Sequence, residues 1–211
     1  NLPTLRQVPE ARSLRFHQLL TIEELQIGEV DLPALIEKAQ RVLDAFDGSV
    51  DAIVSYWDFP ASTLVPILSE RYGTRSTSLE SVVKCEHKYW SRLEQQEVTD
   101  RHPRFDRVDL TAEPPCPPEN VGFPMWVKPA LSYSSELAFG VRDEQEFRTA
   151  VAEIRDGIDR IGRPFEHVLE RISLPPQMDG VGGPVCLAEE ALSGVQVAVE
   201  TQRTYEHADL Y

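Results

Sequence analysis

The sequence predicts an α/β arrangement in its first half, and short strands with an amphipathic helix in its second. Between residues 31 and 73, helical apolar spacing alternates with a short apolar run, as in half of an α/β unit. A proline-rich stretch at residues 102–124 then precedes short strands and one long amphipathic helix. The length of 211 residues suits one domain or two small ones.

Composition and charge exclude several partner classes. The chain is 41% hydrophobic and 27% charged, and no stretch approaches the roughly 18 consecutive apolar residues of a membrane span. The net charge of −14 would repel nucleic acid and anionic membrane surfaces. We therefore expect neither partner, and a polyanionic ligand would need a local cluster of cations.

The three cysteines, Cys85, Cys116 and Cys186, are widely spaced and contain no C-x-x-C pair. Their number and spacing argue against a disulfide framework and a structural zinc site. The five histidines show no metal-ligand spacing. These observations, and the lack of a signal-peptide pattern after Asn1, predict a reducing, cytoplasmic setting.

Two helices and one strand are predicted in the first part of the chain. Asp31 can cap a helix with Pro33 in its first turn, and apolar residues then recur at helical spacing as far as Phe46. The apolar run 52–56 predicts a buried parallel strand. A second helix is expected over about residues 60–72, ending at a glycine.

The middle of the chain predicts a helix followed by irregular structure. Thr77 and Glu80 form a capping-box pattern before a helical stretch that reaches about Gln96, with a break near Cys85. Five prolines before Gly122 indicate a linker or surface loop, and hence a subdomain boundary. The elements and apolar runs predicted beyond it are strands at 125–128, 138–141 and 167–172, a helix at 144–161, and apolar runs at 185–188 and 195–199.

Two groups of cations are candidates for binding an anion. On one continuous helix, Lys84, Lys88 and Arg92 would share a face, which favours an anion or carboxylates opposite; the alternative is a solvated face relieved by Glu80. Lys128 ends an apolar strand before a serine-rich loop. About 4 Å from a phosphate oxygen, its charge would contribute on the order of 4 kcal/mol before desolvation. The alternative is a lysine that reaches solvent.

Glu189 and Glu190 form an acidic pair after an apolar run. Because adjacent residues of a strand point to opposite faces, one carboxylate would face inward and require a partner. The alternative is two exposed acids on an acidic protein. The sequence contains no nucleophile elbow, P-loop or dinucleotide-binding glycine motif.

Taken in order, these segments resemble the ATP-grasp superfamily, close to its carboxylate–amine ligases and biotin-carboxylase-like members. The marks of the resemblance are Cys85-Glu86-His87-Lys88 with Arg92, the run 122–129, Ser134-Ser135, the run 143–147 and the run 188–200. It implies an N-terminal α/β (pre-ATP-grasp) subdomain at 1–76, a helical segment and linker at 77–121, a central α+β ATP-grasp subdomain at 122–200 and an unassigned tail at 201–211.

The resemblance implies an ATP site in a crevice between two subdomains. Lys88 and Lys128 would contact the nucleotide phosphates, and Ser134 and Ser135 would lie in the mobile loop that closes over them. Residues 189–192 would match the strand that recognises adenine. Glu189 would lie within this strand. Glu190 would contact the adenine through its carbonyl and Leu192 through its N–H, and Gln196 would contact the ribose hydroxyls.

The implied reaction is a carbon–nitrogen ligation. ATP with Mg²⁺ phosphorylates a small-molecule carboxylate, and an amine attacks the acyl-phosphate. The family's acidic and Asn ligands for Mg²⁺ have no counterpart after Glu200, so we expect the C-terminal part of the family fold to be missing and this chain alone to be inactive. Neither the acid nor the amine follows from the sequence, and the oligomeric state, a homodimer included, stays open.

Two alternatives remain. The loop after Lys128 has no glycine before Gly140 and carries Leu137 where flexibility is expected. With the missing metal ligands, this favours a degenerate, non-catalytic ATP-grasp scaffold that binds a partner or a small ligand. A receiver-like or other doubly wound domain would account for the first half of the chain only.

Overall fold

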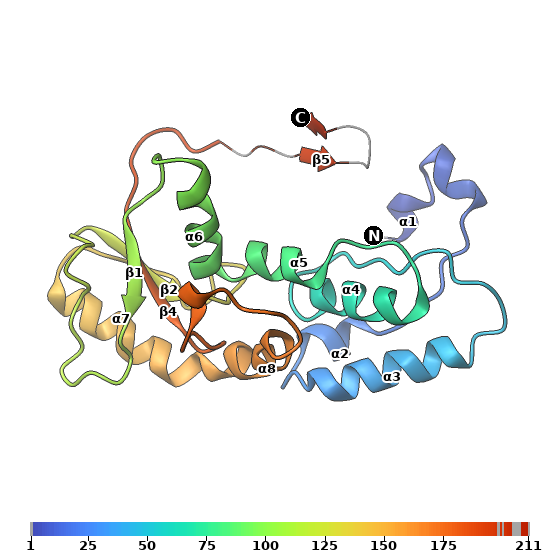
Figure 1. Cartoon of the computed structure of the whole chain (residues 1–211), viewed down its shortest axis with the longest axis horizontal. Coiled ribbons are helices and arrows are strands. Elements are labelled where there is room, and N and C mark those ends of the chain that lie inside the picture. The colour runs from blue at the N-terminus through green and yellow to red at the C-terminus, as the bar shows by residue number, and fades with distance from the viewer. Residues whose placement is uncertain (1, 198, 200, 204–207, 211) are drawn as a thin grey trace.

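The computed structural model describes residues 2–197, 199, 201–203 and 208–210. Its helices are α1 Leu2–Leu5, α2 Ile22–Gln26, α3 Leu32–Asp44, α4 Ala61–Tyr72, α5 Leu79–Glu86, α6 Lys88–Val98, α7 Glu144–Gly157 and α8 Asp159–Leu169. Its strands are β1 Phe105–Val108, β2 Met125–Pro129, β3 Phe139–Val141, β4 Cys186–Glu190, β5 Thr201–Arg203 and β6 Ala208–Leu210. Figure 1 shows a helical part formed by α1 to α4 beside a part built on a sheet.

The two helices expected in the first part of the chain are confirmed. The Asp31 side chain accepts a hydrogen bond from the Ala34 N–H at 3.0 Å and so caps α3. Gly73 ends α4 in the left-handed conformation, with φ of 67°, which glycine adopts without steric cost. The apolar faces of both helices lie in one core with α8.

The prediction of a strand at residues 52–56 is wrong. Ile53 is buried, but Val54 and Tyr56 are each 75% exposed, and among the described residues the first strand is β1. A strand requires a neighbouring strand for its backbone groups, and an apolar run alone cannot show whether one is present. The described part of residues 1–76 is therefore helical, where an α/β subdomain was expected.

The expected break in the middle helix occurs at His87, two residues after Cys85. His87 ends α5, and its Nδ1 accepts a hydrogen bond from the Trp90 N–H at the start of α6. The cap of α5 is Ser78 and not Thr77, since Ser78 Oγ accepts from the Ser81 N–H at 3.1 Å. The break turns α6 toward the sheet, over which it lies in Figure 1.

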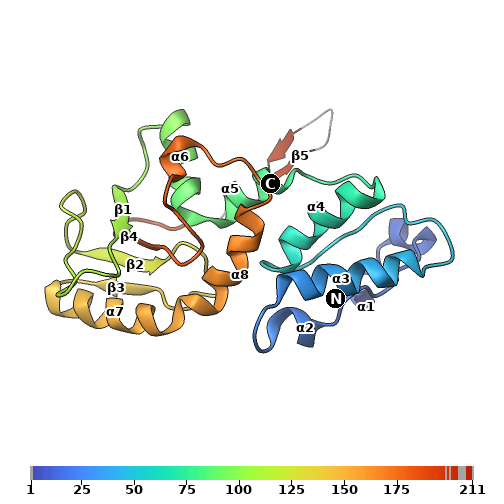
Figure 2. The same cartoon turned by 60° about the horizontal axis from the view of Figure 1, so that its bottom comes forward.

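The four-stranded sheet is antiparallel throughout, in the order β1-β4-β2-β3. Strands β2, β3 and β4 fall at predicted positions, whereas β1, within the proline-rich stretch, was not predicted. Helix α7 covers one face, as Figure 2 shows. The core between them contains Met125, Val127, Val141, Phe147, Ala150, Val151, Ile154 and Ala188.

The long helix predicted at 144–161 is divided into α7 and α8, and α8 continues to Leu169. The strand predicted at 167–172 is therefore wrong: Val168 and Leu169 are buried in the helical core as part of α8. The loop before β4 crosses α8 at a glycine pair, because a Cβ on Gly183 would lie 1.7 Å from the Gly162 carbonyl oxygen. Among the described residues, no helix combines the length and apolar character needed to cross a membrane.

Candidate functional site

The register of β2 and β4 places two charged residues on one face of the sheet. Trp126 pairs with Glu189, and Lys128 pairs with Leu187. Because side chains alternate along a strand, Lys128 and Glu189 share the face opposite α7. Trp126, on the same face, is 46% exposed, so part of this face is open to solvent.

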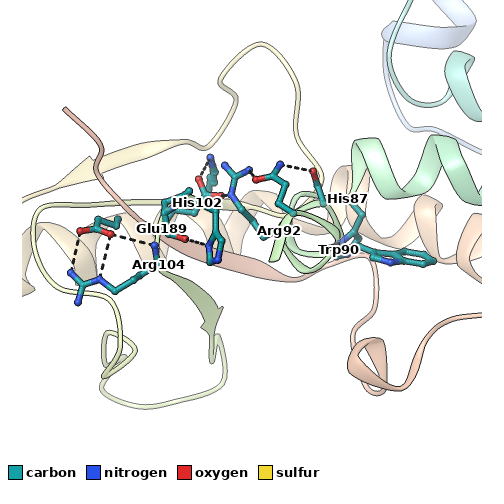
Figure 3. Close-up of polar contacts among 11 residues, drawn as sticks. His87, Trp90, Arg92, His102, Arg104 and Glu189 are labelled. Atoms are coloured by element: carbon teal, nitrogen blue, oxygen red, sulfur yellow. Dashed lines mark hydrogen bonds and ion pairs between the residues drawn. The ribbon is translucent and has the colours of Figure 1, made fainter. Parts of the chain in front are cut away.

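Glu189 is the centre of this face. Only 4% of the residue is exposed, and its Oε2 lies 2.5 Å from Lys128 Nζ. Arg92, from α6, places its Nε 2.7 Å from Glu189 Oε1 (Figure 3). A buried carboxylate requires such partners, because desolvation of an unpaired charge is costly.

Lys88 joins the same site from the first turn of α6. Its backbone N–H donates to the Ala130 carbonyl at 2.9 Å, which ties the start of α6 to the chain after β2. Its Nζ donates to the carbonyl oxygen of Ser132 at 2.6 Å and lies 3.2 Å from the Ser132 hydroxyl. Ser132, a residue that the sequence did not single out as a contact of Lys88, thus holds the ammonium group.

The electrostatics of Lys88 show that the two lysines are neighbours. Burial is the main cause of a pKa of Lys88 lowered to about 8, and repulsion from the Lys128 charge is the second cause. The carboxylates of Glu189, Glu86 and Asp58 act in the opposite direction. Two ammonium groups forty residues apart in sequence therefore lie at one site of an acidic protein.

The prediction that Lys84, Lys88 and Arg92 share one helix face is wrong. The break at His87 separates Lys84 from the other two. Lys84 Nζ lies 3.0 Å from carboxylate oxygens of both Glu80 and Glu94. Lys84 thus belongs to a group of surface ion pairs.

The alternation expected for the acidic pair is confirmed. Glu189 faces inward, whereas the Glu190 side chain is 36% exposed and pairs with Arg104 at 3.1 Å. The Arg104 guanidinium lowers the pKa of Glu190. Leu192 and Gln196 follow the end of β4, and both are exposed; Leu192 is 70% exposed.

The serine-rich loop takes a conformation that glycine would favour. Ser134, Ser135 and Leu137 have φ of 51°, 58° and 55°, in the left-handed region. The loop is attached to the α7–α8 junction: Leu137 lies against Gly157, and Glu136 pairs with Arg160. Left-handed residues other than glycine cost of order 1 kcal/mol each and occur preferentially at ligand-binding sites.

Glu86, a half-buried acid two residues before Lys88, was not predicted as a residue of the site. Burial is the main cause of a pKa of Glu86 raised to about 7; the Ser62 hydroxyl lowers this pKa, the Asp58 carboxylate raises it by less, and the Lys88 charge lowers it. Glu86 Oε2 is buried and has no hydrogen-bond partner among the described residues. Ser62, which acts on Glu86, belongs to α4, and no local sequence signal could have shown that contact.

The described residues contain no group of three or more His, Cys, Asp or Glu that could hold a metal ion. The three cysteines are free, and Cys186 is buried. Mg²⁺ at nucleotide sites takes one or two protein carboxylates together with phosphates, so these residues offer no all-protein site for the Mg²⁺ that the resemblance implies.

The helices and the antiparallel sheet correspond to part of an ATP-grasp-like fold, and a comparison with solved structures supports this fold. The crystal structure of an L-amino acid ligase from Bacillus licheniformis is similar to this chain, with a TM-score of 0.59 and 17% identity. The match covers 86% of this chain and 36% of the ligase, so the chain spans about a third of that protein's length. Neither a model of a protein family nor a curated protein matches the sequence.

Proposed function

We propose that this chain is the nucleotide-binding part of an ATP-grasp ligase and that Lys88 and Lys128 bind the phosphates of ATP. The observation that carries the proposal is the convergence of two ammonium groups on one partly open sheet face of a protein with net charge −14. Lys88 and Lys128 repel one another there, and a polyanion between them would relieve that repulsion. The similarity to an L-amino acid ligase supports the same class of function.

We propose the remaining contacts from the resemblance to the ATP-grasp superfamily. Ser134 and Ser135 lie in the loop after β2, where backbone N–H groups in turn conformations can bind phosphate oxygens. Glu189 and Glu190 end β4, and Leu192 follows it. We assign adenine to this segment, through the Glu190 carbonyl and the Leu192 N–H, and the ribose hydroxyls to Gln196.

The chain's own contribution to catalysis is positioning and charge. In the proposed reaction, the terminal phosphoryl group of ATP passes to a small-molecule carboxylate and ADP leaves. An amine then attacks the resulting acyl-phosphate, which forms the amide bond and releases phosphate and a proton. Lys88 and Lys128 would orient the phosphates and offset the charge on the transferring group. The described residues contain no group of three or more His, Cys, Asp or Glu that could hold a metal ion, so we assign no step to Mg²⁺ here and expect nucleotide binding with little turnover.

One observation favours a non-catalytic scaffold as a second candidate. The loop 132–138 lacks glycine and is attached to α7 and α8 through Leu137 and Glu136. This attachment opposes closure over a phosphate. A scaffold of this kind would bind a partner or a small ligand through the same sheet face without transferring a phosphoryl group.

Calorimetric titration with ATP and Mg²⁺ tests nucleotide binding. We expect Lys128→Met to weaken the affinity at least about tenfold, since a lysine–phosphate contact is worth more than 1.4 kcal/mol at intermediate dielectric. Lys38→Met is the matched control, because Lys38 pairs with Glu24 on the surface of the helical part. No binding by the wild type, or equal affinity in Lys128→Met, would contradict the proposal.

A further inference from the structure

The ion pairs around Glu189 suggest a role for Arg92 that is separate from contact with a ligand. We infer that Arg92 is a positioning residue: by sharing the buried Glu189 carboxylate, it leaves the Lys128 ammonium available to an anionic ligand. The inference rests on the proposed function for the identity of that ligand, a nucleotide phosphate.

The geometry is a three-residue bridge across α6, β4 and β2. Glu189 contributes its two oxygens to different cations, Oε1 to Arg92 at 2.7 Å and Oε2 to Lys128 at 2.5 Å. The carboxylate side chain is 5% exposed, whereas those of Arg92 and Lys128 are 23% and 19% exposed. The buried charge is thus compensated from two sides, and each cation still reaches solvent.

The charges explain why the second cation matters. Glu189 and Lys128 alone would neutralise one another, and a phosphate would compete with the carboxylate for a single ammonium group. With Arg92 present, the bridge carries one net positive charge, and Lys88 adds another on the same face of α6, four residues earlier. A pair of positive charges suits a polyphosphate.

Arg92 is itself held in place. Its Nη1 donates to Gln95 Oε1 at 2.8 Å, one turn further along α6. The guanidinium remains charged at every physiological pH, unlike the ammonium of a buried lysine. Arg92 Nε and Glu189 Oε1 are in ion-pair contact but lack hydrogen-bond geometry, and neither has a hydrogen-bond partner among the described residues. The contact is therefore charge compensation without a directed bond.

The first test compares ATP·Mg²⁺ affinities of Arg92→Gln, Arg92→Lys and the double variant Arg92→Gln/Glu189→Gln with wild type. We expect about a tenfold loss in Arg92→Gln, recovery in Arg92→Lys, and recovery to within about threefold of wild type in the double variant. The double variant removes the carboxylate that would otherwise hold Lys128. Arg142→Gln, at an exposed arginine that pairs with Glu146 of α7, controls for the loss of one charge.

The second test needs no nucleotide. Acetylation of Lys128 by a small anhydride, measured by mass spectrometry relative to Lys38, reports how available the Lys128 amine is. We expect labelling to slow several-fold in Arg92→Gln and to return to the wild-type rate in the double variant. In the control Arg142→Gln, Lys128 should be labelled at the wild-type rate. If labelling follows this pattern but ATP does not bind, the proposed function fails and the role of Arg92 stands. If Arg92→Gln labels Lys128 as the wild type does, or the double variant is no better than the single one, the inference is overturned.

Discussion

Lys128 Nζ lies 2.5 Å from Glu189 Oε2, on the sheet face opposite α7, and this pair organises the candidate site. Glu189 is buried, so its charge depends on the cations brought to it from β2 and α6. Lys88 approaches the same place from the start of α6 and is held by Ser132. The arrangement gives a cationic site to a protein whose net charge is −14.

The lowered pKa of Lys88 predicts that nucleotide affinity depends on pH. Its pKa of about 8 means that the free site loses this charge as the pH rises through 8, whereas bound phosphate would keep the lysine protonated. Affinity for ATP·Mg²⁺ should therefore decrease between pH 7 and pH 9. Calorimetry at several pH values checks this, and Lys88→Arg, which stays charged, should flatten the profile. A wild-type profile as flat as that of Lys88→Arg would contradict the assignment.

The raised pKa of Glu86 predicts that the stability of the protein depends on pH. Its pKa in the folded state, about 7, is above the value of 4.5 expected when unfolded, so the folded state binds the proton more tightly. Its stability contribution is complete below pH 4.5 and is lost as the pH rises through 7, by at most about 3 kcal/mol. Glu86→Gln should therefore raise the free energy of unfolding at pH 8 and change it little at pH 4.5. Urea denaturation at both pH values would measure this, and an equal effect at both would refute it.

The crossing of α8 by the loop before β4 predicts a severe effect of one added methyl group. A Cβ on Gly183 would meet the Gly162 carbonyl oxygen at 1.7 Å, so Gly183→Ala should destabilise the protein by about 3 kcal/mol or more. Gly122→Ala is the matched control, because a Cβ there meets nothing within 4 Å. Thermal unfolding of both variants compares them, and similar midpoints would rule out the tight crossing.

The loop after β2 predicts a difference between two small substitutions. Ser135 has φ of 58°, a conformation that is strained with a Cβ and unstrained in glycine. Ser135→Gly should therefore be more stable than Ser135→Ala by about 1 kcal/mol, despite the greater entropy of glycine in the unfolded chain. Denaturation of the two variants side by side gives this difference. A more stable Ser135→Ala would show that the loop does not hold this backbone conformation.

Local signals in the sequence predicted the elements that depend on local interactions. Helices α3 and α4 follow from the Asp31 cap, the helical spacing and the terminal Gly73. Other elements depend on partners distant in sequence. The run 52–56 has the composition of a strand but no neighbouring strand in the described part of the chain, and β1 is a four-residue strand that β4 pairs with from far along the sequence.

The individual residues of the candidate site could be predicted from the sequence, but the contacts between them could not. The order of the motifs indicated Lys88, Lys128 and Glu189 as site residues. Strand alternation predicted that one acid of the Glu189–Glu190 pair would be buried. The contact between Arg92 and Glu189 depends on how α6 lies over the sheet, which the His87 break decides. Such tertiary contacts have no periodic signature in a single sequence.

A crystal structure of the protein with a non-hydrolysable ATP analogue tests the central claim most directly. We expect phosphate oxygens within hydrogen-bond distance of both Lys88 Nζ and Lys128 Nζ, and the adenine beside residues 190–192. A nucleotide bound elsewhere on the protein, or one whose phosphates contact neither lysine, would contradict it.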